Sequence, residues 1–178
     1  MLTGGTTLTF TISGLGRGTT TEGVVTDATT TATAISFGTL PVSAETEAAQ
    51  RLTVTTNAIS GYQIFAMTDQ GFLNQSSEEI PGVAATNAAP AGWGSGCAAT
   101  STGCYGYHTG DDTLSGGSTR FQANDTYARF ETTTREIAYS SNPVTNDSVD
   151  VIFKTLVRPD QFTGTYQNAV TYIIVPVF

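Results

Sequence analysis

His108 is the only histidine in the chain, so it is the one side chain suited to ordinary acid–base chemistry near neutral pH. A serine nucleophile would need a sharp turn of the type G-x-S-x-G, but Ser95 has Trp93 where the first glycine belongs. No nucleophile, base and orienting group can be assembled from the sequence. We therefore expect a protein that is not an enzyme and that carries no cofactor.

Cys97 and Cys104 are the only cysteines, and six residues separate them. An even pair at short spacing in an extracellular protein predicts a disulfide that closes a small loop. The alternatives are a pair of free thiols or a metal site. Zinc prefers four ligands, and two cysteines with one histidine do not supply them.

Adjacent carboxylates occur at Glu78 and Glu79 and again at Asp111 and Asp112. Neither pair has the spacing of an EF-hand loop, and neighbouring carboxylates do not flank a sugar as a glycosidase requires. Asp111 and Asp112 are weak calcium candidates, and solvated turn residues are the favoured interpretation. We expect no metal site.

Lys154 is the only lysine, and strand alternation places it on the same face as Ile152 and Leu156. A lysine on an apolar face needs a partner, because an unpaired buried charge costs several kcal/mol. A salt bridge would meet that need, and so would an isopeptide bond to Asn57 or Asn168. In the remaining alternative the opposite face is the core, and Lys154 is solvated.

Residues 87–117 are rich in Gly, Ala, Ser and Thr, and we expect them to form one long loop. The segment also carries Trp93, Tyr105, Tyr107 and His108, a candidate ligand-binding set. The aromatic rings would either stack on a glycan or fold the loop back onto the domain. Packing is the favoured alternative.

Alternating polar and apolar residues predict strands along most of the chain. Residues 7–13 place Leu8, Phe10 and Ile12 on one face, and the last segment, 169–178, is apolar on both faces. We expect that segment to be covered on both sides, by its own domain or by a partner, with Pro176 at an edge or a strand end. Residues 43–51 are the best candidate for a helical turn. The pattern predicts a single antiparallel β-sandwich domain over residues 1–178, of Ig-like or jelly-roll type.

The composition indicates an extracellular, cell-surface protein. The chain has 34 threonines, 12% charged residues and a net charge of −8. Threonine favours strands, and its hydroxyl keeps the exposed face of a strand hydrated without adding charge. The negative charge argues against nucleic acid and anionic membranes as partners. No run of 18 apolar residues is present, so we expect no membrane span.

Four segments carry a family resemblance: FGTL at 37–40, LTVTTNA at 52–58, GYQI at 61–64 and GTYQNAVTY at 164–172. In this order they resemble spore-coat-U type pilin subunits of bacterial surfaces, and more loosely TasA-type fibre subunits and surface proteins of candidate-phyla bacteria. The resemblance implies an Ig-like sandwich that polymerises when one subunit donates a strand to the next. Leu8, Phe10 and Ile12 would then be the donated strand, or else simply the first strand of their own sandwich.

Two functional hypotheses follow. The first is a structural subunit of an extracellular fibre, pilus or coat, whose partners are copies of itself or related subunits. The alternative is a monomeric adhesion module that binds a glycan through residues 87–117. A hydrolase is the least supported class.

Overall fold

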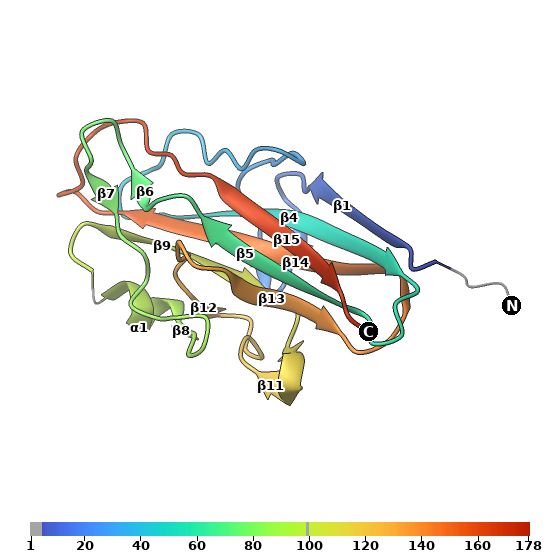
Figure 1. Cartoon of the computed structure of the whole chain (residues 1–178). Helices are drawn as coiled ribbons and strands as arrows, with labels where there is room; N and C mark the ends of the chain where they lie inside the picture. Colours follow the sequence, from blue (N-terminus) through green and yellow to red (C-terminus); the bar gives the residue numbers. More distant parts are fainter. Residues whose placement is uncertain (1–4, 99) are drawn as a thin grey trace, which may run out of the picture.

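The computed structural model describes residues 5–98 and 100–178, and its regular secondary structure is almost entirely antiparallel strand (Figure 1). A four-stranded sheet has the order β1-β4-β14-β9, and a three-stranded sheet has the order β13-β5-β15. Their strands are β1 (Leu8–Gly14), β4 (Glu45–Thr56), β5 (Tyr62–Thr68), β9 (Gly103–Thr109), β13 (Arg135–Ser140), β14 (Val144–Val157) and β15 (Val170–Pro176).

Short elements connect these strands. The remaining elements are β2 (Thr20–Thr21), β3 (Val24–Val25), β6 (Phe72–Leu73), β7 (Glu79–Ile80), β8 (Ala91–Gly92), α1 (Trp93–Ala98), β10 (Thr113–Leu114), η1 (Ser115–Gly117), β11 (Ser118–Thr119) and β12 (Thr126–Tyr127). Within the described ranges, no helix has the length and apolar character that crossing a membrane would require.

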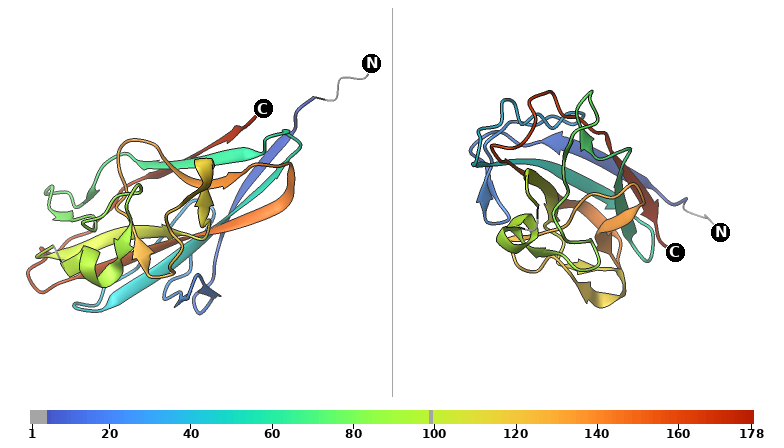
Figure 2. Two further views of the ribbon diagram at one scale, coloured as in Figure 1. Left: turned by 90° about the horizontal axis from the view of Figure 1, so that it is seen from below. Right: turned by 90° about the vertical axis from the view of Figure 1, so that its left-hand side faces the viewer.

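The two sheets pack face to face as a β-sandwich, and Figure 2 shows them as separate layers. The alternation expected from the sequence points Leu52 and Val54 of β4 inward, against Tyr62 and Ile64 of β5 and Phe153 of β14. All five side chains are almost completely buried. Each such aliphatic or aromatic side chain stabilises the fold by about 1.5–3 kcal/mol.

Residues 43–51 do not form a helical turn, so that prediction is wrong. From Glu45 onward they belong to β4, which pairs with β14 from Glu45–Leu156 to Thr56–Val144. Ala48 and Ala49 point to opposite faces of the sheet, and both are fully buried. Pairing with a long neighbouring strand and burial of both faces outweigh the weak helical preference of the segment.

The prediction of one long loop over residues 87–117 is also wrong. The segment contains β8, α1 and β10, and its residues 103–109 form β9, which is buried along its whole length. Small residues are required there: a Cβ atom at Gly106 would lie 3.0 Å from the Ala128 carbonyl oxygen and from Val83 Cγ2. Glycine thus permits close packing here instead of marking a turn.

The last strand, β15, lies at the edge of the three-stranded sheet. Its inward side chains reach the core, but Ile173 and Val175 on the outer face are 39% and 42% exposed. The domain therefore covers only one of the two apolar faces. Pro176 ends the strand, as expected for a residue that cannot donate a ladder hydrogen bond.

Candidate functional site

The predicted disulfide is confirmed. It joins Cys97 in α1 to Cys104 in β9 with a Cα–Cα distance of 5.4 Å, and both residues are buried. It fixes the short helix against the end of the four-stranded sheet. Neither cysteine is free to act as a nucleophile or a metal ligand.

We expect the double variant Cys97→Ala, Cys104→Ala to lose about 2–3 kcal/mol of unfolding free energy, because a short loop is no longer closed in the unfolded chain. Urea denaturation followed by tryptophan fluorescence measures the change, since Trp93 begins the same helix. Reduction of the unmodified protein is the control and should give a similar shift. An unchanged midpoint would show that the disulfide does not stabilise the fold.

The candidate ligand-binding residues are buried. Trp93, Tyr105, Tyr107 and His108 are between 1% and 5% exposed. Trp93 packs edge-on against Tyr127 with ring centroids 5.0 Å apart, and Tyr107 packs on Phe130 at 4.4 Å. The rings are therefore used for packing inside the domain, the alternative that the sequence favoured.

His108 lies in β9, beneath the hairpin of β2 and β3. Its Nδ1 atom lies 2.8 Å from the Thr126 carbonyl oxygen, and its Nε2 atom lies 3.9 Å from the Glu22 carboxylate without a hydrogen-bond partner. Burial lowers the pKa of His108 below its usual value. A buried, neutral imidazole that holds a neighbouring backbone carbonyl is a packing residue.

Asp111 caps backbone groups, and Asp112 is exposed. The two carboxylate oxygens of Asp111 accept hydrogen bonds from Tyr139 N at 2.6 Å and from Thr113 N at 3.0 Å. Among the residues that the structure describes, no group of three or more His, Cys, Asp or Glu side chains is arranged to hold a metal ion. Asp111 therefore joins β10 to β13 and has no oxygen left without a partner.

Burial raises the pKa of Asp111 to about 6, although two backbone N–H groups donate to it. The folded chain then binds this proton more tightly than the unfolded chain does. We expect the contribution of Asp111 to stability to be largest below about pH 4 and to be lost as pH rises through about 6. Carboxyl ¹³C NMR should give its midpoint near pH 6, and a midpoint near 4 would contradict this. The variant Asp111→Asn identifies the resonance.

Lys154 forms salt bridges, one of the alternatives left open by the sequence. As expected, it lies on the face of Ile152 and Leu156. Its Nζ atom lies 2.6 Å from Glu45 Oε2 and 3.0 Å from Glu47 Oε1, while the side chain is 6% exposed. Burial opposes the charge, but the two carboxylates raise the pKa of Lys154 above its usual value.

Two aromatic rings complete the surroundings of Lys154. Its Nζ atom lies 5.0 Å from the centroid of the Trp93 ring and 5.4 Å from that of Tyr127, so both rings add cation–π attraction. The two possible isopeptide acceptors are engaged elsewhere: Asn57 accepts a hydrogen bond from Thr7 N, and Asn168 lies beside Tyr105. The structure therefore favours the salt bridges over an isopeptide bond.

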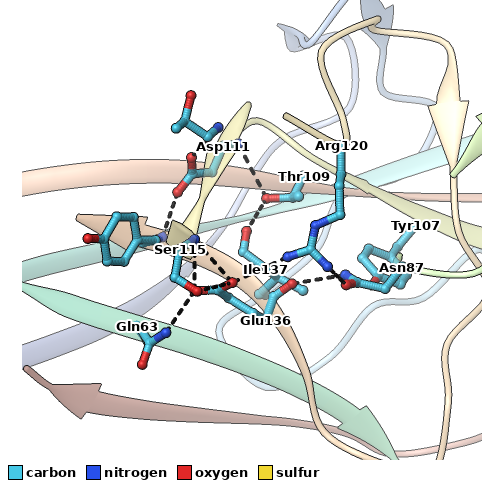
Figure 3. A network of polar contacts seen from close by, with 11 residues as sticks. Gln63, Asn87, Tyr107, Thr109, Asp111, Ser115, Arg120, Glu136 and Ile137 are labelled. Carbon is cyan, nitrogen blue, oxygen red and sulfur yellow. Dashed lines mark hydrogen bonds and ion pairs between the residues drawn. The ribbon is translucent and has the colours of Figure 1, made fainter. Parts of the chain in front are cut away.

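A buried polar network closes one side of the sandwich, where β9 and β13 are the edge strands (Figure 3). Asn87 donates to the Tyr107 hydroxyl at 2.7 Å and to the Glu136 carbonyl at 2.9 Å. The Glu136 carboxylate accepts from Ser115 Oγ at 2.8 Å and pairs with Arg120 at 3.3 Å.

A bulge in β13 adds a direct bond between the two sheets on this side. The register of β13 on β5 shifts between Glu136 and Ala138. The carbonyl oxygen of Ile137, between them, accepts a hydrogen bond from Thr109 Oγ1 in β9 at 2.6 Å. Bulges end regular pairing and redirect backbone groups, so the β9–β13 side offers no free strand edge here.

The opposite side of the sandwich, bordered by β1 and β15, is open. The inward side chains of both strands pack on the core but are only partly buried; they are Leu8, Phe10, Ile12, Val170, Tyr172 and Ile174. The expected strand at residues 7–13 is β1, Leu8–Gly14, and in the single chain it is the first strand of its own sandwich, one of the two alternatives that the sequence left open. We call this feature the open side.

The same strands present unpaired backbone groups at the open side. Just beyond the two ends of β15, Ala169 O accepts from Asp69 N at 3.1 Å, and Val177 N donates to Gly61 O at 2.9 Å. Hydrogen-bonded residues alternate along an antiparallel strand, so the odd-numbered residues of β15 also bond to β5. In an antiparallel ladder the alternate residues then point their N–H and C=O groups away from the partner strand. These are Val170, Tyr172 and Ile174, whose side chains also face inward.

The open side is the feature that sequence reasoning missed as a site. The resemblance singled out Leu8, Phe10 and Ile12, but the pattern gave no sign that β1 and β15 would be the two free edges of one sandwich. Comparison of the sequence with protein-family models, with curated proteins and with solved structures finds no match. The fold defines the class of the protein: an antiparallel β-sandwich with one disulfide.

Proposed function

We propose that the chain is a structural subunit of an extracellular assembly, in which a strand of a neighbouring copy adds to the exposed edge of β15. The observation that carries this proposal is the combination of a free backbone edge and an uncovered apolar face on one strand. Added strands obtain affinity from main-chain hydrogen bonds and specificity from alternate side chains. Such a strand would satisfy the edge and place its own outer-face side chains beside Ile173 and Val175.

Composition and chemistry support an extracellular location. A disulfide is typical of oxidising compartments. A threonine-rich surface with few charges suits strands that must stay wet on one face, and the four segments that resemble spore-coat-U type pilin subunits favour an assembled state. The glycan-binding alternative has less support, because the rings of residues 87–117 on which it depended are buried.

Strand addition at the edge fits the geometry better than exchange of β1. In the folded chain β1 pairs with β4 along seven residue pairs, from Leu8–Thr56 to Gly14–Gln50. Exchange would break this ladder before a new one could form, whereas addition at β15 breaks nothing. The donated strand is therefore an edge strand of the neighbour and not a displaced β1.

We expect assembly that increases with protein concentration, visible by light scattering after size-exclusion chromatography and by negative-stain microscopy. The double variant Ile173→Lys, Val175→Lys should abolish it, because charged side chains block edge pairing. The variant Val25→Lys is a matched control, since Val25 is 55% exposed on a distant hairpin. A protein that stays monomeric at all concentrations, or a control variant with the same defect, would contradict the proposal.

A further inference from the structure

The hairpin of β2 and β3 lies over His108, and its turn approaches the sheet closely. Each of its strands has two residues, and the turn between them consists of Glu22 and Gly23, with φ angles of 45° and 76°. Gly110 follows β9, and a Cβ atom there would overlap the Glu22 carboxylate. Glycine at this position therefore allows the Glu22 side chain to rest against the end of β9.

The base of this hairpin is anchored more firmly than its tip. At the base, the Thr26 hydroxyl donates to Gly16 O at 2.7 Å, and Thr26 N donates to Thr19 O at 3.0 Å. At the tip, the hydrogen bond to the sheet comes from the Thr21 hydroxyl, which donates to Asp150 Oδ2 at 2.6 Å. Segments with few anchoring contacts open locally at a smaller free-energy cost than the whole domain. The tip can therefore open while the base stays in place.

The hydrogen bonding of His108 suits only a neutral ring. Because Thr126 O accepts from Nδ1, that atom carries the ring proton, and Nε2 has a lone pair. Nε2 is buried without a hydrogen-bond partner, and the Glu22 carboxylate is 3.9 Å away, too far for a hydrogen bond. Protonation would place a positive charge and an unbonded N–H group at this point, which is unfavourable in a buried site.

The acidic side chains around His108 compensate a positive charge there only in part. Burial lowers the pKa of His108, and the exposed carboxylates Asp112 and Asp125 offset only some of this effect. Burial also raises the pKa of Glu22, as do the charges of Asp150 and Asp112, so Glu22 takes up a proton itself in acid. The closed hairpin therefore favours a neutral imidazole.

The remaining neighbours are a compensated ion pair and two buried rings. Asp150 in β14 accepts hydrogen bonds from the Arg51 guanidinium of β4 at 2.7 Å and 2.8 Å. The rings of Phe121 and Tyr127 lie with their centroids 5.7 Å and 5.9 Å from that of the imidazole. Burial raises the pKa of Tyr127, so its hydroxyl stays neutral. A change of charge in mild acid is therefore confined to the histidine and Glu22.

We propose that the β2–β3 hairpin is an acid-released flap, whose opening exposes His108 to water and allows it to become charged. In the open form the hydrated imidazole binds a proton with the usual pKa of about 6.5, whereas the closed form binds it less tightly. The closed form is thus favoured most above about pH 6.5, and this preference declines as pH falls toward the lower pKa of buried His108.

Glu22 acts in the opposite direction and limits the release to mild acid. Its pKa is raised in the closed form, so protonation of Glu22 at lower pH favours closure. The flap needs only one copy of the chain and does not depend on the assembly proposed above.

NMR of the full chain tests the flap directly, because His108 is the only histidine. The imidazole ¹⁵N shifts should show a neutral ring protonated at Nδ1 at pH 7.5, and the titration midpoint should lie below about 6.5. Amide hydrogen exchange, corrected for the intrinsic effect of pH, gives the opening constant of the hairpin. This constant should rise about 5- to 10-fold for β2 and β3 between pH 7.5 and pH 5.5, while β4 should not change.

Two variants and a control separate the imidazole from other effects of acid. His108→Gln has no titratable side chain and should abolish the rise in the opening constant. Glu22→Gln supplies the N–H group that Nε2 lacks and should lower the opening constant at pH 7.5 about 3- to 10-fold, the effect of one added hydrogen bond. Asp160→Asn, at an exposed position outside the hairpin, should leave the rise unchanged.

Four results would each overturn the proposal. They are a His108 midpoint at or above about 6.5, an opening constant that does not rise in acid, a rise that persists in His108→Gln, and a Glu22→Gln hairpin that opens as readily as the unmodified one. Should His108→Gln not fold by circular dichroism, the midpoint and the exchange of the unmodified protein still decide. Absence of assembly would not affect the flap.

Discussion

Replacement of Lys154 by alanine is expected to destabilise the protein by about 3 kcal/mol, because removing one partner of a buried ion pair leaves the other charge uncompensated. Glu47 would keep a carboxylate that is only 14% exposed without its cation. Glu45 is 46% exposed and can be solvated, which keeps the cost at the lower end of the usual range. Urea denaturation at pH 7 measures the change.

The pH dependence of this variant separates charge from packing. Burial already raises the pKa of Glu47, and Lys154 partly offsets the shift. Without Lys154 the pKa of Glu47 rises further, so the folded variant gains stability as pH falls and this carboxylate takes up a proton. The loss caused by Lys154→Ala should therefore shrink between pH 7 and pH 5. A loss that is constant with pH would mean that only packing against Trp93 and Tyr127 was removed.

Two controls accompany this variant. Lys154→Met keeps an apolar side chain against the two rings, so about half of the stability should return. Glu45→Gln changes only the more exposed partner, and its effect should stay below about 1 kcal/mol.

Replacement of Asn87 by alanine is expected to cost about 2–4 kcal/mol, because several buried polar groups lose their partner at once. Asn87 is 1% exposed and binds the Tyr107 hydroxyl, the Glu136 carbonyl and the Arg120 guanidinium. It joins β9 to β13 where the sandwich closes. In Asn87→Ala, amide hydrogen exchange should speed up more for β13 than for β4, relative to the unmodified protein, since the network lies at the β13 edge.

Asn124→Ala is the matched control for Asn87→Ala, since Asn124 is exposed. Its effect should fall within about 0.5 kcal/mol. If Asn87→Ala were equally mild, the polar network of Figure 3 would not hold the two edge strands together.

The strands with clear alternation were predictable. Leu8, Phe10 and Ile12 in β1, and Leu52 and Val54 in β4, face the core as their spacing indicates. Period-two burial is a local property of the chain, so a single sequence contains it. The disulfide was predictable for a similar reason, because two cysteines allow only one intramolecular pairing.

Strand β9 was not predictable from local pattern. It contains Gly103 and Gly106, and all of its residues are buried, so it has neither alternation nor a β-branched run. Its strand conformation depends on pairing with β14, from Gly103–Val157 to Thr109–Val151. Such long-range pairing, together with the small residues that it requires, overrides local propensity.

The open side arises from tertiary structure alone. Strands β1 and β15 are far apart in the chain, and nothing in their composition predicts that they border the same side of the sandwich. The apolar outer face of β15 did carry a signal, because residues 169–178 are apolar on both faces. An apolar pattern on both faces predicts that both faces of the strand must be buried, and the fold buries only the inner face.

Amide hydrogen exchange on the assembled and the monomeric protein tests the central proposal most directly. Strand addition at β15 predicts that the amides of Val170, Tyr172 and Ile174 become protected on assembly, while those of β9 do not change. These three amides point to the open side in a single copy. Assemblies in which the three amides still exchange as fast as in the monomer would contradict strand addition at β15.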